Sequence, residues 1–349
     1  MSRKTGHCRQ TYEQPATGFP TWYDVLPADS IVINMETPGN ATAGGKLALV
    51  TGGAGFIGSH ISERLLADGY RVRILDNFST GKRENIPDSP LVEVISGDVA
   101  DFETVSSAMQ GAAIVFHEAA IASVPETVGN PLASERVNYR GTLNVLEAAR
   151  HAGTRRVMFA CSAAVYGDLP ELPKQESMPV RPLSPYAVDK LASEHACQVY
   201  WHLYGLETVS LRYFNVFGPR QDPSSPYSGV ISIFADRLQK GEQPAIYGDG
   251  EQTRDFVYVS DVVEANIRAA TAPAAPGRAI NVATGGTITI NGLLQTICKI
   301  KNQPFAPRYL PGREGDIRHS RADISIAAEI LGWQPGVDFE AGLRKLFDT

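Results

Sequence analysis

LALVTGGAGFIG, at residues 47–58, indicates the architecture of this chain more strongly than any other segment. Its first four residues form a short apolar run, which is typical of a strand buried on both faces of a parallel sheet. Helical periodicity through Ile61, Leu65 and Leu66 follows the glycines, and a second short strand expected at 72–75 ends at Asp76. Strand, glycine turn, helix, strand and acid together predict a βαβ unit that binds a dinucleotide.

The glycines and Asp76 also indicate which dinucleotide binds. Glycines let the backbone turn tightly and approach a pyrophosphate, whose charge is favoured at a helix N-terminus. Asp76 lies 18 residues beyond Gly58, where a carboxylate accepts hydrogen bonds from the adenosine ribose hydroxyls. A carboxylate there repels a 2′-phosphate, so we expect NAD. Lys82 and Arg83 are the one feature that favours NADP, although loop charges are more often simply solvated. A glycine turn without any ligand is the alternative, and the flanking strands argue against it.

Composition restricts the class of protein. The chain has 349 residues, of which 43% are hydrophobic and 20% charged, so it can bury a large core and is long for one domain. The net charge of −6 gives no electrostatic reason to expect a nucleic acid or a membrane surface as partner. No apolar run approaches the roughly 20 residues of a membrane helix. Four scattered cysteines without metal-ligand spacing indicate reduced thiols and no metal in a cytoplasmic protein: Cys8, Cys161, Cys197 and Cys298.

We expect three regions along the chain. Residues 1–45 are polar and contain four prolines, so they should form a mobile extension or an arm packed on the rest. Strand and helix alternate through residues 46–216, which predicts an α/β fold with a doubly wound parallel sheet and a return segment near 255–283. Prolines, glycines and short elements dominate residues 217–349, which should form mainly a smaller substrate-binding lobe.

Two polar residues outside the main motifs need an interpretation. His117 follows an expected strand at 112–116, and a histidine in such a turn is more often structural, so we assign it no chemistry. Asn138 lies inside an expected long helix at 132–152. It can bridge backbone to active site through water, or it can simply cap a neighbouring loop.

Tyr186 and Lys190 form the pair that predicts catalysis. They are four residues apart on an expected helix at 186–204, so both lie on one face. A phenol has a reference pKa near 10 and is a poor base at neutral pH. A nearby ammonium and a positively charged nicotinamide should both lower that pKa. Ser162, at the end of an expected strand, can hydrogen-bond the same reacting hydroxyl.

These motifs resemble the extended short-chain dehydrogenase/reductases and, among them, the UDP-hexose 4-epimerases. The resemblance covers about residues 46–345. The matching motifs are TGGAGFIG at 51–58, DNFSTG at 76–81, CSAAVYG at 161–167, YAVDK at 186–190, RYFNVFGPRQDP at 212–223, YGDGEQTRDFVYVSD at 247–261 and REGDIRHS at 313–320.

The resemblance implies a set of site residues. The implied catalytic group is Ser162, Tyr186 and Lys190. The implied NAD contacts are Gly52, Gly55, Phe56, Ile57, Gly58, Asp76, Asn77, Ser79, Thr80, Gly81, Asp98, Val99, Ala119, Ala120, Ala122, Tyr186, Lys190 and Phe214. The implied nucleotide-sugar contacts are Ser123, Ser162, Asn215, Val230, Arg254, Arg313, Asp316 and Ser320.

The implied reaction inverts C4 of a UDP-hexose. Tyr186, as phenolate, takes the proton of the 4-hydroxyl while C4 gives its hydride to tightly bound NAD⁺. The 4-keto sugar then turns over in the pocket and takes the hydride back on its other face. By resemblance, the helix of Tyr186 and the helix at 132–152 pair between two subunits, so we also expect a homodimer.

Three residues bear on the substrate. Related 4,6-dehydratases and uronate decarboxylases place acids just after the strand-end serine or threonine, whereas this chain has Ala163 and Ala164. Ser320 stands where a tyrosine would exclude an N-acetyl group, which favours UDP-GlcNAc and UDP-GalNAc, with or without UDP-Glc and UDP-Gal. A plain surface serine is the simpler interpretation. A UDP-glucuronate 4-epimerase and a non-catalytic NAD(H) sensor remain alternatives.

Overall fold

The computed structural model describes residues 45–221, 229–312 and 317–347. Their main element is a seven-stranded sheet in the order β11-β6-β5-β4-β1-β2-β3, in which every neighbouring pair is parallel. The strands are β1 (Leu47–Thr51), β2 (Arg71–Asp76), β3 (Val92–Ser96), β4 (Ile114–His117), β5 (Arg156–Ser162), β6 (Glu207–Tyr213) and β11 (Arg278–Val282). The strand order reverses between β1 and β4, which is where an open α/β sheet binds its ligand.

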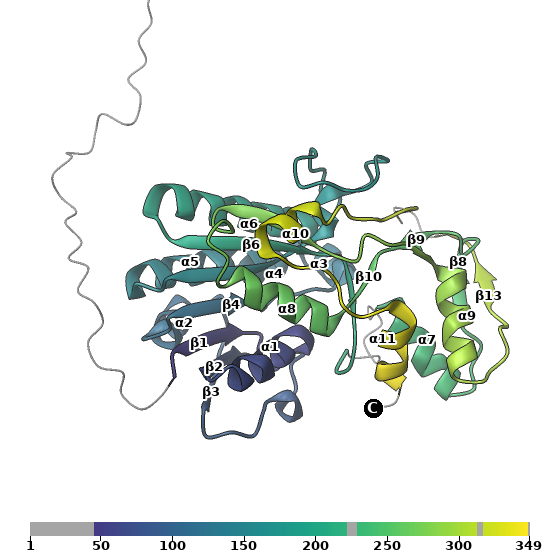
Figure 1. The fold of residues 1–349 in the computed structure, drawn as a ribbon, viewed down its shortest axis with the longest axis horizontal. Helices are drawn as coiled ribbons and strands as arrows, with labels where there is room; N and C mark the ends of the chain where they lie inside the picture. Colours follow the sequence, from purple (N-terminus) through teal and green to yellow (C-terminus); the bar gives the residue numbers. More distant parts are fainter. Residues whose placement is uncertain (1–44, 222–228, 313–316, 348–349) are drawn as a thin grey trace, which may run out of the picture. The chain divides into compact units, whose positions relative to one another are not determined.

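Helices cover both faces of this sheet (Figure 1). Alternate residues of each strand point to opposite faces, so each face has its own core. One core joins the sheet to α1 (Phe56–Ala67), α8 (Val259–Ala269) and α10 (Ser325–Leu331). The other joins it to α2 (Phe102–Met109), α5 (Gly141–Ala152) and α6 (Pro185–Tyr204). The predicted doubly wound parallel fold is therefore confirmed.

A third hydrophobic cluster lies beyond the carboxyl end of the sheet, among shorter elements. It includes α7 (Val230–Gln239), α9 (Ile290–Ile300) and α11 (Phe339–Phe347). Three small two-stranded sheets belong to this region: β7 (Asn215–Phe217) with β10 (Phe256–Tyr258), β9 (Thr253–Arg254) with β12 (Ile288–Thr289), and β8 (Ala245–Tyr247) with β13 (Arg308–Leu310). The expected boundary near residue 216 stays a prediction, and the expected extension at 1–45 lies outside the described residues except for its last position.

The helix expected at 132–152 is not one regular α-helix. It consists of α4 (Pro131–Ser134), a π-helical turn η3 (Glu135–Arg140) and α5. The carbonyl of Asn138 accepts hydrogen bonds from the hydroxyls of Thr142 (2.6 Å) and Ser193 (3.2 Å), and such side-chain competition disturbs the regular ladder. Its side-chain amide accepts from the Ile121 N–H (2.8 Å) and donates to the Ile121 carbonyl (3.1 Å). Asn138 therefore caps a neighbouring loop.

His117 is a structural residue in the described fold. Its ring nitrogens lie 2.7 Å from Thr51 Oγ1 and 3.0 Å from Thr142 Oγ1, and the side chain is fully buried. Burial lowers the pKa of His117 to about 3, so the ring is neutral and ties β1 to α5. Cys161, Cys197 and Cys298 are buried free thiols. Across the described segments, no helix combines the length and apolar character that crossing a membrane requires.

Candidate active site

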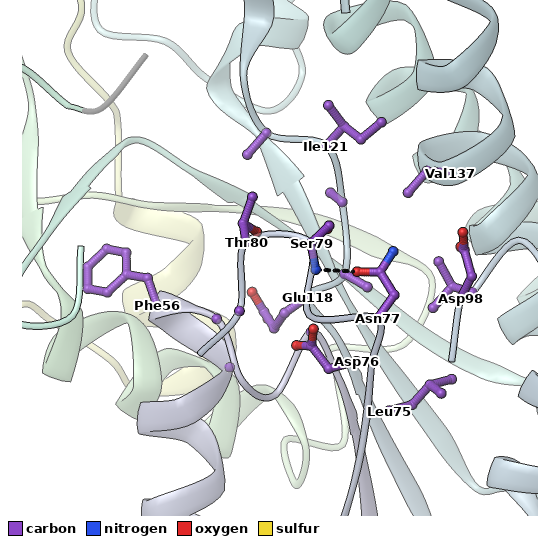
Figure 2. Close-up of a pocket in the computed structure, with 18 of the residues that line it drawn as sticks. Phe56, Leu75, Asp76, Asn77, Ser79, Thr80, Asp98, Glu118, Ile121 and Val137 are labelled. Atoms are coloured by element: carbon purple, nitrogen blue, oxygen red, sulfur yellow. Dashed lines mark hydrogen bonds between the residues drawn. The ribbon is translucent and has the colours of Figure 1, made fainter. Parts of the chain in front are cut away.

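A cavity of 460 Å³ opens at the carboxyl ends of β1, β2, β3 and β4 (Figure 2). It brings together fifteen of the residues that the sequence assigned to NAD: Gly52, Gly55, Phe56, Ile57, Gly58, Asp76, Asn77, Ser79, Thr80, Gly81, Asp98, Val99, Ala119, Ala120 and Ala122. The lining also contains residues that sequence reasoning missed: Leu75, Gly97, Glu118, Ile121, Glu126, Arg136 and Val137. Most of these directly neighbour an assigned residue, whereas Glu126, Arg136 and Val137 come from later helices.

Two positions of the glycine turn have no space for a side chain. Gly52 has φ +68°, and a Cβ there would lie 2.8 Å from the backbone nitrogen of Ala119. A Cβ on Gly58 would lie 2.3 Å from the Gly52 carbonyl oxygen. Helix α1 begins after Gly55 without a side-chain cap, so its first N–H groups face the cavity as an anion site. The turn therefore fits a pyrophosphate.

Asp76 is fixed at the end of β2 by backbone donors. One carboxylate oxygen accepts from the Ala54 N–H (2.9 Å) and the other from the Phe78 N–H (2.8 Å). A Cβ on Gly81 would lie 2.8 Å from this carboxylate, so the 76–81 turn folds tightly over it. Each carboxylate oxygen keeps a lone pair for a ribose hydroxyl. The geometry fits the adenosine ribose of NAD, which the sequence assigned to Asp76.

Ser162 and Tyr186 meet near Glu118, which lines this cavity, as their positions predicted. Helix α6 begins at Pro185 after the N-cap Ser184, and this start places Tyr186 in the first turn. A hydrogen bond joins the phenol of Tyr186 to the hydroxyl of Ser162, the last residue of β5. One turn along, Lys190 donates from Nζ to the Ala160 carbonyl (2.7 Å), and this nitrogen lies 5.8 Å from the centre of the Tyr186 ring.

The pKa of Tyr186 differs from the expectation. Burial raises it to about 12, while the hydrogen bond from Ser162 lowers it only in part. Lys190 is itself buried, and burial lowers the pKa of its ammonium. For the protein groups alone, the net shift of the phenol pKa is therefore upward, because burial raises it by more than the expected lowering by Lys190. Desolvation outweighs one ammonium that already donates to a carbonyl.

Glu118 is one of the lining residues that sequence reasoning left out, and it lies close to the catalytic group. It accepts a hydrogen bond from the Tyr213 hydroxyl (2.9 Å), which in turn accepts one from the Asn266 amide (2.7 Å). Burial raises the pKa of Glu118 to about 7, against lowering by the Tyr213 hydrogen bond and by Lys190. Its charge also contributes to the raised pKa of Tyr186. The sequence signal that could have identified Glu118 is a carboxyl group directly before Ala119-Ala120, at the end of a buried strand.

The raised pKa of Glu118 predicts a pH-dependent stability. The folded state keeps a proton that the unfolded state loses near the ordinary pKa of 4.5. The stability contribution is therefore present in full below about pH 4.5 and is lost as the pH rises through about 7. Glu118→Gln should remove this dependence, so the difference in melting temperature between wild type and variant should change across that window and be constant above it.

The matched control is Glu147→Gln on α5. A hydrogen bond from Arg150 lowers the pKa of Glu147 to about 2, so its ionisation does not change over the same window. Melting curves of both variants from pH 4 to 9 test the prediction. Parallel pH profiles for wild type and Glu118→Gln would contradict it.

A second cavity, of 240 Å³, contains three of the residues assigned to the nucleotide sugar: Asn215, Val230 and Arg254. Phe234, Ala245, Ile246, Tyr247, Gln252 and Ile290 complete its lining. Ser320 is not among these residues, but its N–H donates to the Thr253 carbonyl (3.2 Å), directly before Arg254. Arg313 and Asp316 lie outside the described residues.

The remaining assigned residues line neither cavity. Ser123 accepts a hydrogen bond from the Glu126 N–H (3.2 Å) and caps α3 (Val124–Gly129). Phe214 is buried, and its backbone N–H donates to the Val282 carbonyl (3.1 Å). The other three residues form the group at the end of β5 and the start of α6: Ser162, Tyr186 and Lys190. Within the described ranges, no cluster of three His, Cys, Asp or Glu side chains could hold a metal ion.

Comparisons with known proteins agree with this geometry. The model of the NAD-dependent epimerase/dehydratase family matches residues 48–283, and the chain belongs to this family. It is 42% identical over 302 residues to a UDP-glucose 4-epimerase of Mycolicibacterium smegmatis, covering 85% of this chain and 96% of that protein. It is 35% identical over 319 residues to a UDP-N-acetyl-alpha-D-glucosaminuronate decarboxylase of Bacillus cytotoxicus, covering 86% and 96%.

A solved structure also resembles this chain. A UDP-N-acetylglucosamine 4-epimerase from Methanobrevibacter ruminantium M1, in complex with UDP-N-acetylmuramic acid, aligns with a TM-score of 0.84 and 42% identity. The alignment covers 87% of this chain and 98% of that one. NAD is the cofactor of the family, and the glycine cradle and Asp76 fit it. When bound, NAD supplies a hydride acceptor and donor; the chain's own residues must bind the substrate and move the proton.

Proposed function

We propose that this chain is a 4-epimerase of UDP-hexoses that keeps NAD tightly bound through the reaction. The observation that carries the proposal is the hydrogen-bonded Ser162–Tyr186 pair, which lies near enough to Glu118 of the NAD-type cavity for the charge of Glu118 to raise the pKa of Tyr186. Two 4-epimerases at 42% identity over nearly their full length support it. UDP-GlcNAc and UDP-GalNAc are the proposed substrates, with or without UDP-Glc and UDP-Gal.

Each residue has a proposed task in the inversion at C4. Tyr186 takes the proton from the 4-hydroxyl and gives it back after the sugar has turned over. Ser162 orients that hydroxyl through its hydrogen bond with the phenol, and Lys190 favours the phenolate by charge. Arg254 holds the diphosphate, since a guanidinium forks onto phosphate oxygens, and Asn215 borders the same cavity. The anchored nucleotide leaves the hexose free to present its other face.

A decarboxylase is the alternative that a relative favours, because the Bacillus cytotoxicus protein is 35% identical. Loss of a carboxyl group from a 4-keto sugar benefits from an acid beside the strand-end serine. Ala163 and Ala164 occupy the positions after Ser162, and they begin the short 3₁₀ turn η4 (Ala163–Tyr166). Neither side chain can donate or accept a proton, which supports epimerisation.

One experiment separates the candidates. Purified protein is incubated without added NAD with UDP-GlcNAc, UDP-Glc, UDP-GlcA and UDP-GlcNAcA, and the products are resolved by NMR. Interconversion at C4 supports the epimerase with retained NAD, and the sugar that reacts identifies the substrate, UDP-glucuronate included. Release of CO₂ would identify a decarboxylase. No product from any sugar, with NAD bound, would favour a non-catalytic sensor.

Ser320→Tyr tests the proposed substrate preference. Ser320 lies beside the strand of Arg254, and a phenol there should fill the space of an N-acetyl group. We expect kcat/KM for UDP-GlcNAc to fall by about tenfold or more, while the value for UDP-Glc is maintained. The second substrate is the internal control for folding. An equal loss of kcat/KM with both sugars, or no loss with either, would contradict the proposed role of Ser320 in substrate preference.

We also propose a homodimer formed through α6 and the helix segment before α5. Several large apolar side chains on these elements are exposed: Leu132, Val188, Val199, Trp201 and Leu203. Exposed large apolar side chains on neighbouring helices are typical of an interface between copies of a chain. Light scattering on the protein as it elutes from a size-exclusion column measures its molecular mass directly. A monomer at micromolar protein concentration would contradict the proposal.

A further inference from the structure

The π-helical turn η3 and the start of α5, which follows it directly, are held against both walls of the NAD cavity. On one side, both amide atoms of Asn138 are bonded to the backbone of Ile121, which lines the cavity. On the other side, Asn144 donates from Nδ2 to the Val99 carbonyl (2.9 Å). Gly141 packs so closely on Val99 that a Cβ there would lie 2.7 Å from the valine side chain. The segment therefore bridges the loops after β3 and β4.

Two successive residues of this turn reach the cavity itself. Val137 and Arg136 both line it, at the end that contains Asp98 and Val99 (Figure 2 labels Val137 and Asp98). Arg136 donates from one terminal guanidinium nitrogen to Asp98 Oδ2 (3.0 Å), while Asp98 Oδ1 accepts from the Ala100 N–H (2.9 Å). The ion pair thus joins η3 to Asp98, the carboxylate that the family resemblance places at the adenine of NAD.

We propose that η3 closes the adenine end of the cavity and that Arg136, paired with Asp98, slows the exit of NAD. The inference deepens the proposed function, since an epimerase that reuses its cofactor must retain it. A carboxylate has about four lone-pair sites, so Asp98 can accept from Ala100, Arg136 and an adenine amino group at once. Arg136 is therefore a positioning residue for Asp98 and a cover over the adenine, and it takes no part in the chemistry.

The chain contains a matched control one turn away. Arg140 ends the same π-helical segment and pairs with Glu135 at 3.5 Å, but it does not line the cavity. The side chains of Arg136 and Arg140 are similarly exposed, at 57% and 63%. Arg136→Gln and Arg140→Gln therefore remove the same charge from the same segment. Only the first removes a contact with the cavity.

The experiment measures cofactor exit without turnover. Full-length protein is loaded with NADH, mixed with excess NAD⁺ in a stopped-flow instrument, and followed by NADH fluorescence at low and high salt. Arg136→Gln should release NADH about threefold to fivefold faster than wild type at low salt, the range of one exposed ion pair. Arg140→Gln should match wild type. High salt should speed release from wild type and leave Arg136→Gln nearly unchanged, because screening acts on the ion pair.

Two further results bear on the proposal. ADP-ribose, which has the adenine but no nicotinamide, should lose affinity for Arg136→Gln by the same factor. Equal release rates for the two variants, slower release from Arg136→Gln, or no binding of NADH to wild type would each overturn the proposal. No UDP-sugar enters the measurement, so inactivity toward UDP-sugars would defeat the proposed function without affecting this test.

Discussion

Tyr186→Phe should lower kcat for 4-epimerisation by about 10²–10⁴-fold, the usual contribution of one positioned acid or base. The phenol is in hydrogen-bond contact with Ser162 and carries a proton that it can exchange with the sugar hydroxyl. Phenylalanine keeps the ring and its packing but removes that oxygen. The hydride step then leaves an alcohol proton without an acceptor, so both directions of the reaction should slow equally.

A tyrosine on the same helix provides the control. Tyr200 donates its hydroxyl proton to Glu147 (2.9 Å) on α5 and lines neither cavity. Tyr200→Phe removes the same atom from α6 and should keep kcat within about twofold, as for surface substitutions. Initial rates and NAD content are measured for both variants. Retention of full activity by Tyr186→Phe, with NAD bound, would exclude the proposed proton transfer.

Arg212→Ala should destabilise the fold by about 3–5 kcal/mol, because it leaves a buried carboxylate without its partner. Arg212 forms two hydrogen bonds to Glu194, from Nε (2.8 Å) and from a terminal nitrogen (2.6 Å). The two side chains are only 5% and 1% exposed. A further nitrogen of Arg212 donates to the Tyr166 hydroxyl (2.8 Å), which donates to Asn281 (2.7 Å). Water cannot replace these contacts in the packed interior.

This network also connects the elements that carry the catalytic group. Glu194 lies one turn beyond Lys190 on α6 and accepts from the Cys161 thiol (3.3 Å), directly before Ser162. Loss of the network should therefore disturb the Ser162–Tyr186 contact as well as the fold. A double variant, Arg212→Met with Glu194→Leu, leaves no unpaired charge and should recover most of the lost stability.

Denaturant unfolding of wild type, Arg212→Ala, the double variant and Arg318→Ala tests this account. Arg318 forms an equally short pair with Asp249 (2.7 Å), but both partners are largely exposed, so its removal should leave the unfolding midpoint nearly unchanged. An equal loss in Arg318→Ala and Arg212→Ala would contradict the argument from burial.

The sequence predicted those features that local patterns determine. Apolar runs and glycine turns repeat in order, so the parallel sheet and fifteen residues that line the NAD cavity followed from the sequence pattern and the family resemblance. The Tyr186–Ser162 contact followed because strand ends meet at one edge of a parallel sheet. Ser320 and Ser123 were assigned by resemblance alone, and neither lines a cavity among the described residues.

Features that depend on competition between distant groups were not predictable. The π-helical turn arises because the Asn138 carbonyl bonds Thr142 and Ser193, and Ser193 belongs to another helix. The raised pKa of Tyr186 arises from desolvation, which no spacing of charged residues reveals. The ion pair of Arg136 was not predictable from the sequence because its partner Asp98 is 38 residues away along the chain.

The place of β11 in the sheet has a consequence for how the chain folds. This strand pairs with β6 along its whole length, yet more than sixty residues, which include α7, β8 and α8, separate the two in sequence. Until residue 282 has left the ribosome, β6 remains an open edge that can pair with another chain. We therefore expect the sheet and the elements between β6 and β11 to fold together, as one long-range and comparatively slow event.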